Sequence, residues 1–193
     1  MEHPGCVILA AGAASRFGEN KLTVPLHGRS LIRRALEAVP AEHFASVVVV
    51  TQYPAIMCLA KEFHFAALHN PHPERGLSSS LQMGLTALRD CGGVLFLVAD
   101  QPLLRRESVA ELVRLWQSRP RGIAALGHRG VRGNPCLFPQ HLFPELMALT
   151  GDQGGSAVIR RHPSELTLLE VPEQELLDVD TAAALEALSR ETP

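Results

Sequence analysis

The sequence predicts an α/β protein, a three-layer α/β/α sandwich in which a Rossmann-like, mostly parallel sheet lies between two layers of helices. Short apolar runs of strand length recur at 6–11, 46–51, 93–99 and 122–126. Two of them are almost uninterrupted Val, Ile, Leu or Phe, which is typical of strands buried on both faces of a parallel sheet. Helical patterns lie between the runs, and strands that alternate with helices form right-handed crossovers.

Apolar residues at helical spacing mark the expected helices. Residues 31–39 show this spacing after Ser30, a suitable N-cap, and residues 81–88 show it after Ser79 and Ser80. Beyond these segments, helices are expected at 54–63, 107–117 and 181–190. After residue 127 the pattern loosens into turns and short elements.

Composition limits the kinds of partner. The 193 residues suit one domain, with 46% hydrophobic and 20% charged residues and a net charge of −2. Lys and Arg are scattered, so no footprint for nucleic acid or an anionic membrane is expected. The apolar stretches are too short to span a bilayer, and no basic segment precedes an apolar signal core. We therefore expect a cytoplasmic protein with no nucleic-acid or membrane partner.

Residues 9–21, which read LAAGAASRFGENK, form the first candidate binding loop. Gly12 allows close backbone approach, and Ser15, Arg16 and Lys21 add donors, so the loop could cradle a triphosphate. Its spacing matches neither the G-x-x-x-x-G-K-[ST] phosphate loop nor the G-x-G-x-x-G dinucleotide fingerprint. The residue after the second strand is also not acidic, since Thr51-Gln52 stands there. An ordinary strand-to-helix turn with solvated charges explains the spacing of the loop equally well.

Two acidic sites are expected near the same edge of the sheet. Ligands of an open parallel sheet bind beyond the carboxyl ends of its strands, so the loops after Ala11, Ala99 and Val179 are the places to expect a site. Asp100 directly follows a buried strand, where Mg²⁺ bridging phosphate oxygens would offset its charge, although a turn cap explains it equally well. Asp178 and Asp180 precede the terminal helix and could cap it.

The loop resembles the signature L-A-[AG]-G-x-S-x-R-x-G-x-x-K of the MobA-like NTP transferases and keeps every fixed position. This resemblance implies the fold of the nucleotide-diphospho-sugar transferases, which is GT-A-like. It also implies that the loop holds the triphosphate, that Arg16 contacts phosphate and that Lys21 stabilises charge at the α-phosphate. Asp100 and Asp180 would be the ligands of Mg²⁺, with Mn²⁺ as the alternative, and Arg16, Lys21 and Asp100 would be catalytic. The loop residues expected to bind nucleotide are Leu9, Ala10, Ala11, Gly12, Ser15, Arg16 and Lys21.

Three further segments resemble motifs of this family. Residues 70–81 read alone as a flexible loop and a helix N-cap, but they resemble the family's turn beneath the nucleobase. Gly76 and Ser80 would then contact the base. Segments 132–135 and 151–155 resemble acceptor-side motifs, and the residues expected there are Gly133, Asn134, Asp152 and Gly154. Residues 1–127 would thus be the nucleotide-binding part, and residues 128–193 would supply the acceptor side and the second metal ligand.

The cytidylyltransferase branch for molybdenum cofactor is the best match, because Leu-Ala-Ala-Gly stands at 9–12 and the base turn and acceptor motifs are similar to that branch. The resemblance implies that CTP and molybdenum-bound molybdopterin give the cytosine dinucleotide cofactor and pyrophosphate, with a molybdenum hydroxylase apoenzyme as a further partner. The sequence departs from the branch in having no Trp in the turn at 70–76. A guanylyltransferase for the same cofactor, a cytidylyltransferase for another phosphorylated small molecule and a non-catalytic molybdopterin carrier remain alternatives.

Overall fold

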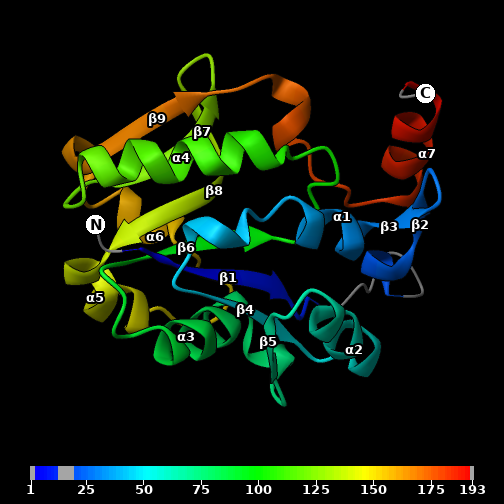
Figure 1. Ribbon diagram of the computed structural model, residues 1–193, viewed down its shortest axis with the longest axis horizontal. Helices are drawn as coiled ribbons and strands as arrows, with labels where there is room; N and C mark the ends of the chain where they lie inside the picture. Colours follow the sequence, from blue (N-terminus) through cyan, green and yellow to red (C-terminus); the bar gives the residue numbers. More distant parts are fainter. Residues whose placement is uncertain (1–2, 13–19, 192–193) are drawn as a thin grey trace.

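The computed structural model describes residues 3–12 and 20–191, and its centre is a seven-stranded sheet in the order β5-β4-β1-β6-β8-β7-β9 (Figure 1). Strand β8 runs antiparallel to both of its neighbours, whereas the other four pairs are parallel. The sheet is therefore mostly parallel, as the sequence predicts. The strands are β1 (Gly5–Ala10), β4 (Ser46–Thr51), β5 (Ala66–His69), β6 (Gly93–Val98), β7 (Ile123–His128), β8 (Val131–Pro139) and β9 (Leu166–Glu170).

Helices cover both faces of the sheet, which confirms the predicted three-layer sandwich. Successive side chains of a strand point to opposite faces. Accordingly Ile8 and Leu97 belong to one core cluster, while Val7 and Phe96 belong to the other. The first cluster packs on α1 (Leu31–Glu37), α2 (Pro54–Glu62) and α4 (Arg106–Ser118), and the second on α3 (Leu77–Ala87), α5 (Phe143–Met147) and α6 (Ser156–Ile159).

A third, smaller cluster fixes the C-terminal helix α7 (Ala182–Glu191). It joins that helix to the hairpin of β2 (Pro25–Leu26) and β3 (Arg29–Ser30), which lies beside it in Figure 1. Val179, just before α7, has a fully buried side chain in this cluster. The acidic segment at 178–180 is thus anchored by packing on both of its sides.

The start of one helix and the structure after residue 127 differ from the sequence prediction. Helix α3 begins at Leu77, with Gly76 as its N-cap, and not behind Ser79 and Ser80. Gly76 has φ +84°, and a Cβ there would lie 2.4 Å from the carbonyl carbon of Gly151, so the tight turn requires glycine. The region after residue 127 is also more regular than predicted, because it contributes β8 and β9 to the sheet.

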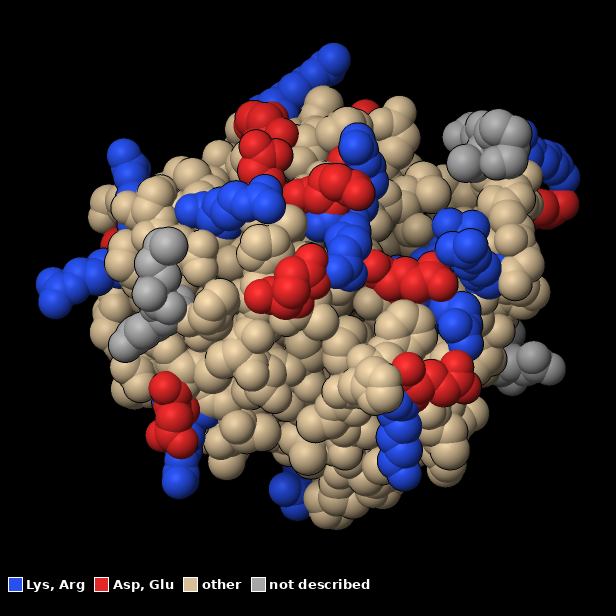
Figure 2. Space-filling view, in the orientation of Figure 1, with Lys and Arg blue, Asp and Glu red and all other residues tan. Residues whose placement is uncertain are grey.

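Charges of both signs are interspersed on the face of the molecule that Figure 2 shows. Neither sign gathers there into one broad patch. Among residues 3–12 and 20–191, no helix has the length and apolar character to cross a membrane.

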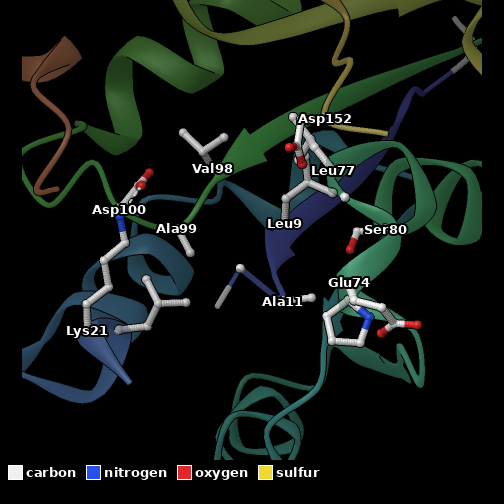
Figure 3. Close-up of a pocket in the computed structure, with 14 residues that line it drawn as sticks. Leu9, Ala11, Lys21, Glu74, Leu77, Ser80, Val98, Ala99, Asp100 and Asp152 are labelled. Carbon is white, nitrogen blue, oxygen red and sulfur yellow. Dashed lines mark hydrogen bonds and ion pairs between the residues drawn. The ribbon is translucent and has the colours of Figure 1, made fainter. Parts of the chain in front are cut away.

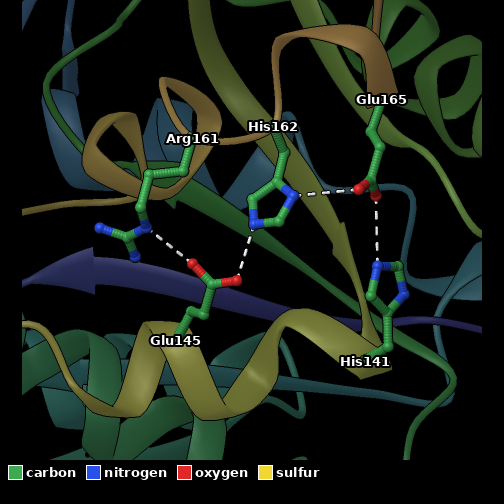
Figure 4. A network of polar contacts seen from close by, with 5 residues as sticks. All are labelled: His141, Glu145, Arg161, His162 and Glu165. Atoms are coloured by element: carbon green, nitrogen blue, oxygen red, sulfur yellow. Dashed lines mark hydrogen bonds and ion pairs between the residues drawn. The ribbon is translucent and has the colours of Figure 1, made fainter.

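A chain of ion pairs joins α5 to the segment that precedes β9 (Figure 4). Glu145 on α5 accepts from Arg161 Nε at 2.7 Å and pairs with His162 Nε2 at 2.7 Å. The other ring nitrogen of His162 lies 3.0 Å from Glu165, whose second oxygen lies 3.2 Å from His141. Since both nitrogens of His162 face carboxylate oxygens, the doubly protonated ring fits this position. The hydrogen bond with Glu145 is the main cause that raises the pKa of His162 above its ordinary value.

We predict that this network stabilises the fold less as pH rises above neutrality. A histidine whose pKa is raised on folding contributes its full stability below its unfolded pKa of about 6.5 and loses it as pH rises through the folded pKa. The difference in unfolding free energy between wild type and His162→Gln should therefore shrink between pH 6 and pH 8, as measured by urea denaturation. Glu145→Gln serves as the control, since in that background the pH dependence of the His162 effect should be much smaller. A difference that is constant over this range would contradict the prediction.

Candidate active site

A pocket of about 390 Å³ opens at the carboxyl ends of β1 and β6. Strand β1 pairs with β4 on one side and β6 on the other, so this is a switch point of the strand order, where ligands bind in open α/β sheets. In Figure 3, Lys21 and Asp100 lie at one end of the pocket. Ser80, Glu74 and Asp152 lie at the other end, which the start of α3 helps to form.

Lys21 brings together the two predicted metal ligands. Its Nζ donates to Asp100 Oδ2 at 2.8 Å and to Asp180 Oδ1 at 3.1 Å. The lysine begins a short 3-10 helix that Asn20 caps by accepting from Leu22 N. Partial burial lowers the pKa of Lys21, but the hydrogen bonds and charges of Asp100 and Asp180 outweigh it and raise the pKa above its ordinary value. The site therefore holds a charged ammonium group between two carboxylates.

Backbone and side-chain hydrogen bonds bring Asp180 to this place. Val179 N donates to Asp100 O at 2.9 Å, and Gln101 Nε2 donates to Leu176 O at 3.1 Å. Val179 does not end a strand, so the prediction of a strand-end loop there was wrong, and these bonds take the place of a strand pairing. The role of Gln101, whose side chain is buried, was not predicted from the sequence. Its place directly after Asp100 was the one available signal.

Asp178 lies at a second pocket and not at the first one. The second pocket, of about 500 Å³, is lined by Asp178 together with Gln101, Arg132, Gly133 and Asn134. Desolvation and then the charge of Asp100 raise the pKa of the Asp178 carboxyl above its ordinary value, although the residue itself is exposed. Asp100 lines the first pocket and Gln101 the second, so consecutive residues contribute to the two pockets.

The carboxylates fit a divalent cation that binds with a phosphorylated substrate. Asp100 and Asp180 already share one cationic group, so their oxygens face a common point. Mg²⁺ prefers oxygen ligands and is often held by one or two carboxylates together with substrate phosphates. Lys21, at the same point, could pair with those phosphates.

The structure gathers most of the predicted nucleotide residues and separates the acceptor-side set. Ala10 is buried, and its carbonyl accepts from Thr51, whereas Ser15 and Arg16 lie outside the described residues. Asp152 lines the first pocket beside Gly76 and not the second, because the turn at Gly76 packs on Gly151. Gly154 packs on the Leu77 side chain, while Gly133 and Asn134 line the second pocket. The residues predicted to bind nucleotide that line the first pocket are Leu9, Ala11, Gly12, Lys21, Gly76, Ser80 and Asp100.

A switch-point pocket that combines a strand-end loop, a lysine and two carboxylates fits an enzyme that acts on nucleoside triphosphates. The chain belongs to the MobA-like NTP transferase domain family, whose profile matches residues 6–166, and it is a nucleotidyltransferase.

Sequence similarity to proteins from three bacteria supports the assignment to this family. The chain is 28% identical over 197 residues to the purine catabolism protein PucB of Bacillus subtilis, covering 95% of each chain. It is 27% identical over 139 residues to the molybdenum cofactor cytidylyltransferase of Escherichia coli, covering 68% of each. It is also 27% identical over 113 residues to a molybdenum cofactor guanylyltransferase of Xanthomonas euvesicatoria, covering 58% of this chain and 55% of that one.

Solved structures show the same fold. The structure of Rv0371c from Mycobacterium tuberculosis has a TM-score of 0.82 at 23% identity, with 98% of each chain covered. A complex of Rv0371c with manganese has a TM-score of 0.75 at 19% identity and covers both chains fully.

We predict that Asp100→Asn reduces turnover by a factor of about 100 or more, because it removes a carboxylate expected to hold the metal ion. The melting temperature should change little, since the residue lies in the loop after β6 with a partly exposed side chain and not in the apolar core. Pyrophosphate release and thermal denaturation measure the two effects. Asp90→Asn, at a carboxylate that is 94% exposed, is the matched control and should behave as wild type. Wild-type turnover by Asp100→Asn would remove Asp100 from the mechanism.

We predict that Gln101→Met weakens Mn²⁺ binding about tenfold, because residues that orient metal ligands typically change metal affinity by about 10- to 100-fold. The substitution removes the tether to Leu176 O and so loosens the segment that carries Asp180. Free Mn²⁺ can be counted by electron paramagnetic resonance in solutions without added phosphate, since tripolyphosphate would itself bind Mn²⁺.

The control for this variant is Gln82→Met, which removes a comparable tether from Gln82 to the carbonyls of Met147 and Leu149. Gln82→Met should bind Mn²⁺ as wild type does. Equal Mn²⁺ affinity in wild type and Gln101→Met would show that the tether does not position Asp180.

Proposed function

We propose that the protein transfers CMP from CTP to molybdenum-bound molybdopterin, giving the cytosine dinucleotide form of the cofactor and pyrophosphate. The observation that carries this proposal is the position of Lys21 Nζ between Asp100 and Asp180, at one end of a pocket whose other end suits a nucleobase. Support for the base and the acceptor comes from the Leu-Ala-Ala-Gly sequence at 9–12 and from the similarity to the Escherichia coli cytidylyltransferase.

The triphosphate would lie along the end of β1, with its α-phosphate toward Lys21. The ammonium group of Lys21 would pair with the charge that grows on the α-phosphate oxygens during attack. Asp100 and Asp180 would hold Mg²⁺, or Mn²⁺ in its place. Bound there, the metal would supply further positive charge to the same phosphate oxygens.

The other end of the pocket would hold cytosine. Ser80 Oγ accepts from Asn70 Nδ2 at 2.9 Å, so the serine hydroxyl can donate its own hydrogen toward the ring nitrogen or carbonyl of the base. Asp152 lines the same end and can accept from the exocyclic amine of cytosine. These groups match the pattern of donors and acceptors on the cytosine edge.

The acceptor would enter from the second pocket, where Gly133, Asn134 and Arg132 lie. A phosphate monoester is already ionised at neutral pH, so its oxygen needs positioning and not a strong base. Because Asp100 lines the first pocket and Gln101 the second, the acceptor would approach the α-phosphate from the side of these two residues. In this proposal residues 128–193 supply most of the acceptor side, whereas Asp152 serves the base, Asp180 the metal ion, and Gly154 packs on Leu77 away from the second pocket.

A guanylyltransferase for the same cofactor is the second candidate. Asp152 favours it as well, because a carboxylate can also accept from the ring and exocyclic N–H groups of guanine. The similarity to the Xanthomonas guanylyltransferase supports this alternative.

Acceptor-dependent pyrophosphate release tests the proposal directly. With Mg²⁺ and molybdenum-loaded molybdopterin, CTP should support release at least about tenfold faster than GTP or ATP, since one well-placed polar contact to a base is worth about 1.4 kcal/mol or more. Parallel reactions without acceptor control for simple hydrolysis. Preference for GTP would establish the guanylyltransferase alternative, and no acceptor-dependent release would exclude molybdopterin as the acceptor.

A further inference from the structure

Three consecutive side chains, which begin with the last residue of β4, hold three consecutive carbonyls, which begin with the last residue of β1. Thr51 Oγ1 donates to Ala10 O at 2.9 Å, Gln52 Nε2 to Ala11 O at 2.7 Å, and Tyr53 Oη to Gly12 O at 3.1 Å. We call Thr51, Gln52 and Tyr53 the carbonyl clamp. Thr51 and Gln52 stand where a dinucleotide-binding protein would carry an acidic residue, and the structure shows a different use for this position.

The turn from β4 into α2 makes this arrangement possible. Strands β1 and β4 are parallel neighbours with Ala10 opposite Thr51, so both chains leave the sheet at the same level. Successive side chains of an extended strand would point to opposite faces. The chain turns toward α2 at Pro54, and Tyr53 N donates to Thr51 Oγ1 at 3.1 Å, which fixes the buried threonine. All three donors can therefore reach the same stretch of backbone.

The clamp determines where the amide groups of the loop point. In a trans peptide unit the C=O and the N–H point in opposite directions. Holding the carbonyls of Ala10 and Ala11 on one side therefore directs the N–H groups of Ala11 and Gly12 to the other side. Ala11 and Gly12 line the pocket, whereas the clamp side chains do not. A Cβ on Gly12 would meet nothing within 4 Å, so a phosphate group could approach this backbone closely.

We propose that Thr51, Gln52 and Tyr53 are positioning residues for the triphosphate, because they hold the backbone of residues 10–12 so that the N–H groups of Ala11 and Gly12 point toward the phosphates. They act through the loop and do not touch the substrate. The inference rests on the triphosphate site of the proposed function, but it does not depend on which base or acceptor is used.

The test separates the phosphate chain from the base. Inorganic tripolyphosphate with Mg²⁺ is the base-free probe, and cytidine is the phosphate-free probe, with both affinities measured by calorimetry. Gln52→Met and Tyr53→Phe each remove one donor and keep most of the side-chain volume. Each should weaken tripolyphosphate binding about fivefold, the effect of losing one modest hydrogen bond, and leave cytidine binding unchanged. The double variant should be weaker still. Thr51→Val is less informative, because this buried residue also supports the fold.

Gln140→Met is the matched control, since Gln140 Nε2 also donates to a backbone carbonyl, that of Arg89, near the opposite end of β6. It should bind both probes as wild type does. Unchanged tripolyphosphate affinity in both clamp variants would overturn the inference, and so would a parallel loss for both probes with a lower melting temperature. Failure of the wild-type protein to bind tripolyphosphate would overturn it as well. The base preference in the pyrophosphate assay tests the proposed function separately.

Discussion

The site depends on holding two like charges at one point of a partly desolvated pocket. Asp100 and Asp180 come from distant parts of the chain and would repel each other without a cation between them. The Lys21 ammonium supplies that cation, at 2.8 and 3.1 Å from the two carboxylates. Because both carboxylates are partly exposed, the ion pairs alone contribute little to keeping the segments together. The buried Val179 side chain and the backbone bond from Val179 N to Asp100 O carry that role.

The start of the loop after β1 is likewise held in place by groups other than the charged ones. The sheet ends β1 and β4 at one level, and the carbonyl clamp then uses this parallel register to direct the start of the loop. Support comes from neutral hydrogen bonds outside the pocket, which salt and substrate charge disturb little. In the proposed function, the charged groups inside the pocket are thereby left to interact with the phosphates. A site arranged in this way can bind a highly charged substrate without placing its own loop under strong electrostatic strain.

The sequence was sufficient to predict the strands that are buried on both faces. Strands β1, β4 and β6 were predicted because residues buried on both faces must be apolar throughout. Strand β8 was not, because it contains Gly133, Asn134 and Pro135, residues that usually mark turns. The close packing of the Gly76 turn was not predicted either, because its contact is with Gly151, which lies far away in the sequence.

The site shows the same limit. Lys21, Asp100 and Asp180 were predicted through motif resemblance, and their mutual contact follows from long-range packing that no spacing encodes. The carbonyl clamp and Gln101 were missed for another reason. Their partners are backbone carbonyls, which every residue has, so the side-chain pattern does not reveal these hydrogen bonds, and the position of Gln101 directly after Asp100 was the one available signal.

The short segment at 151–156 contacts both the proposed base site and the second pocket. Gly151 O accepts from Ser78 N beside the first pocket, which Asp152 lines and whose end near α3 is the proposed base site. A few residues later, Ser156 Oγ accepts from Arg132 Nη2 at 2.6 Å beside the second pocket. The segment lies outside the sheet, so its residues can change without altering the strands that position Lys21 and Asp100. Base choice and acceptor choice can therefore shift together on an unchanged catalytic frame, which is a physical route by which relatives of one fold come to include both cytidylyl- and guanylyltransferases.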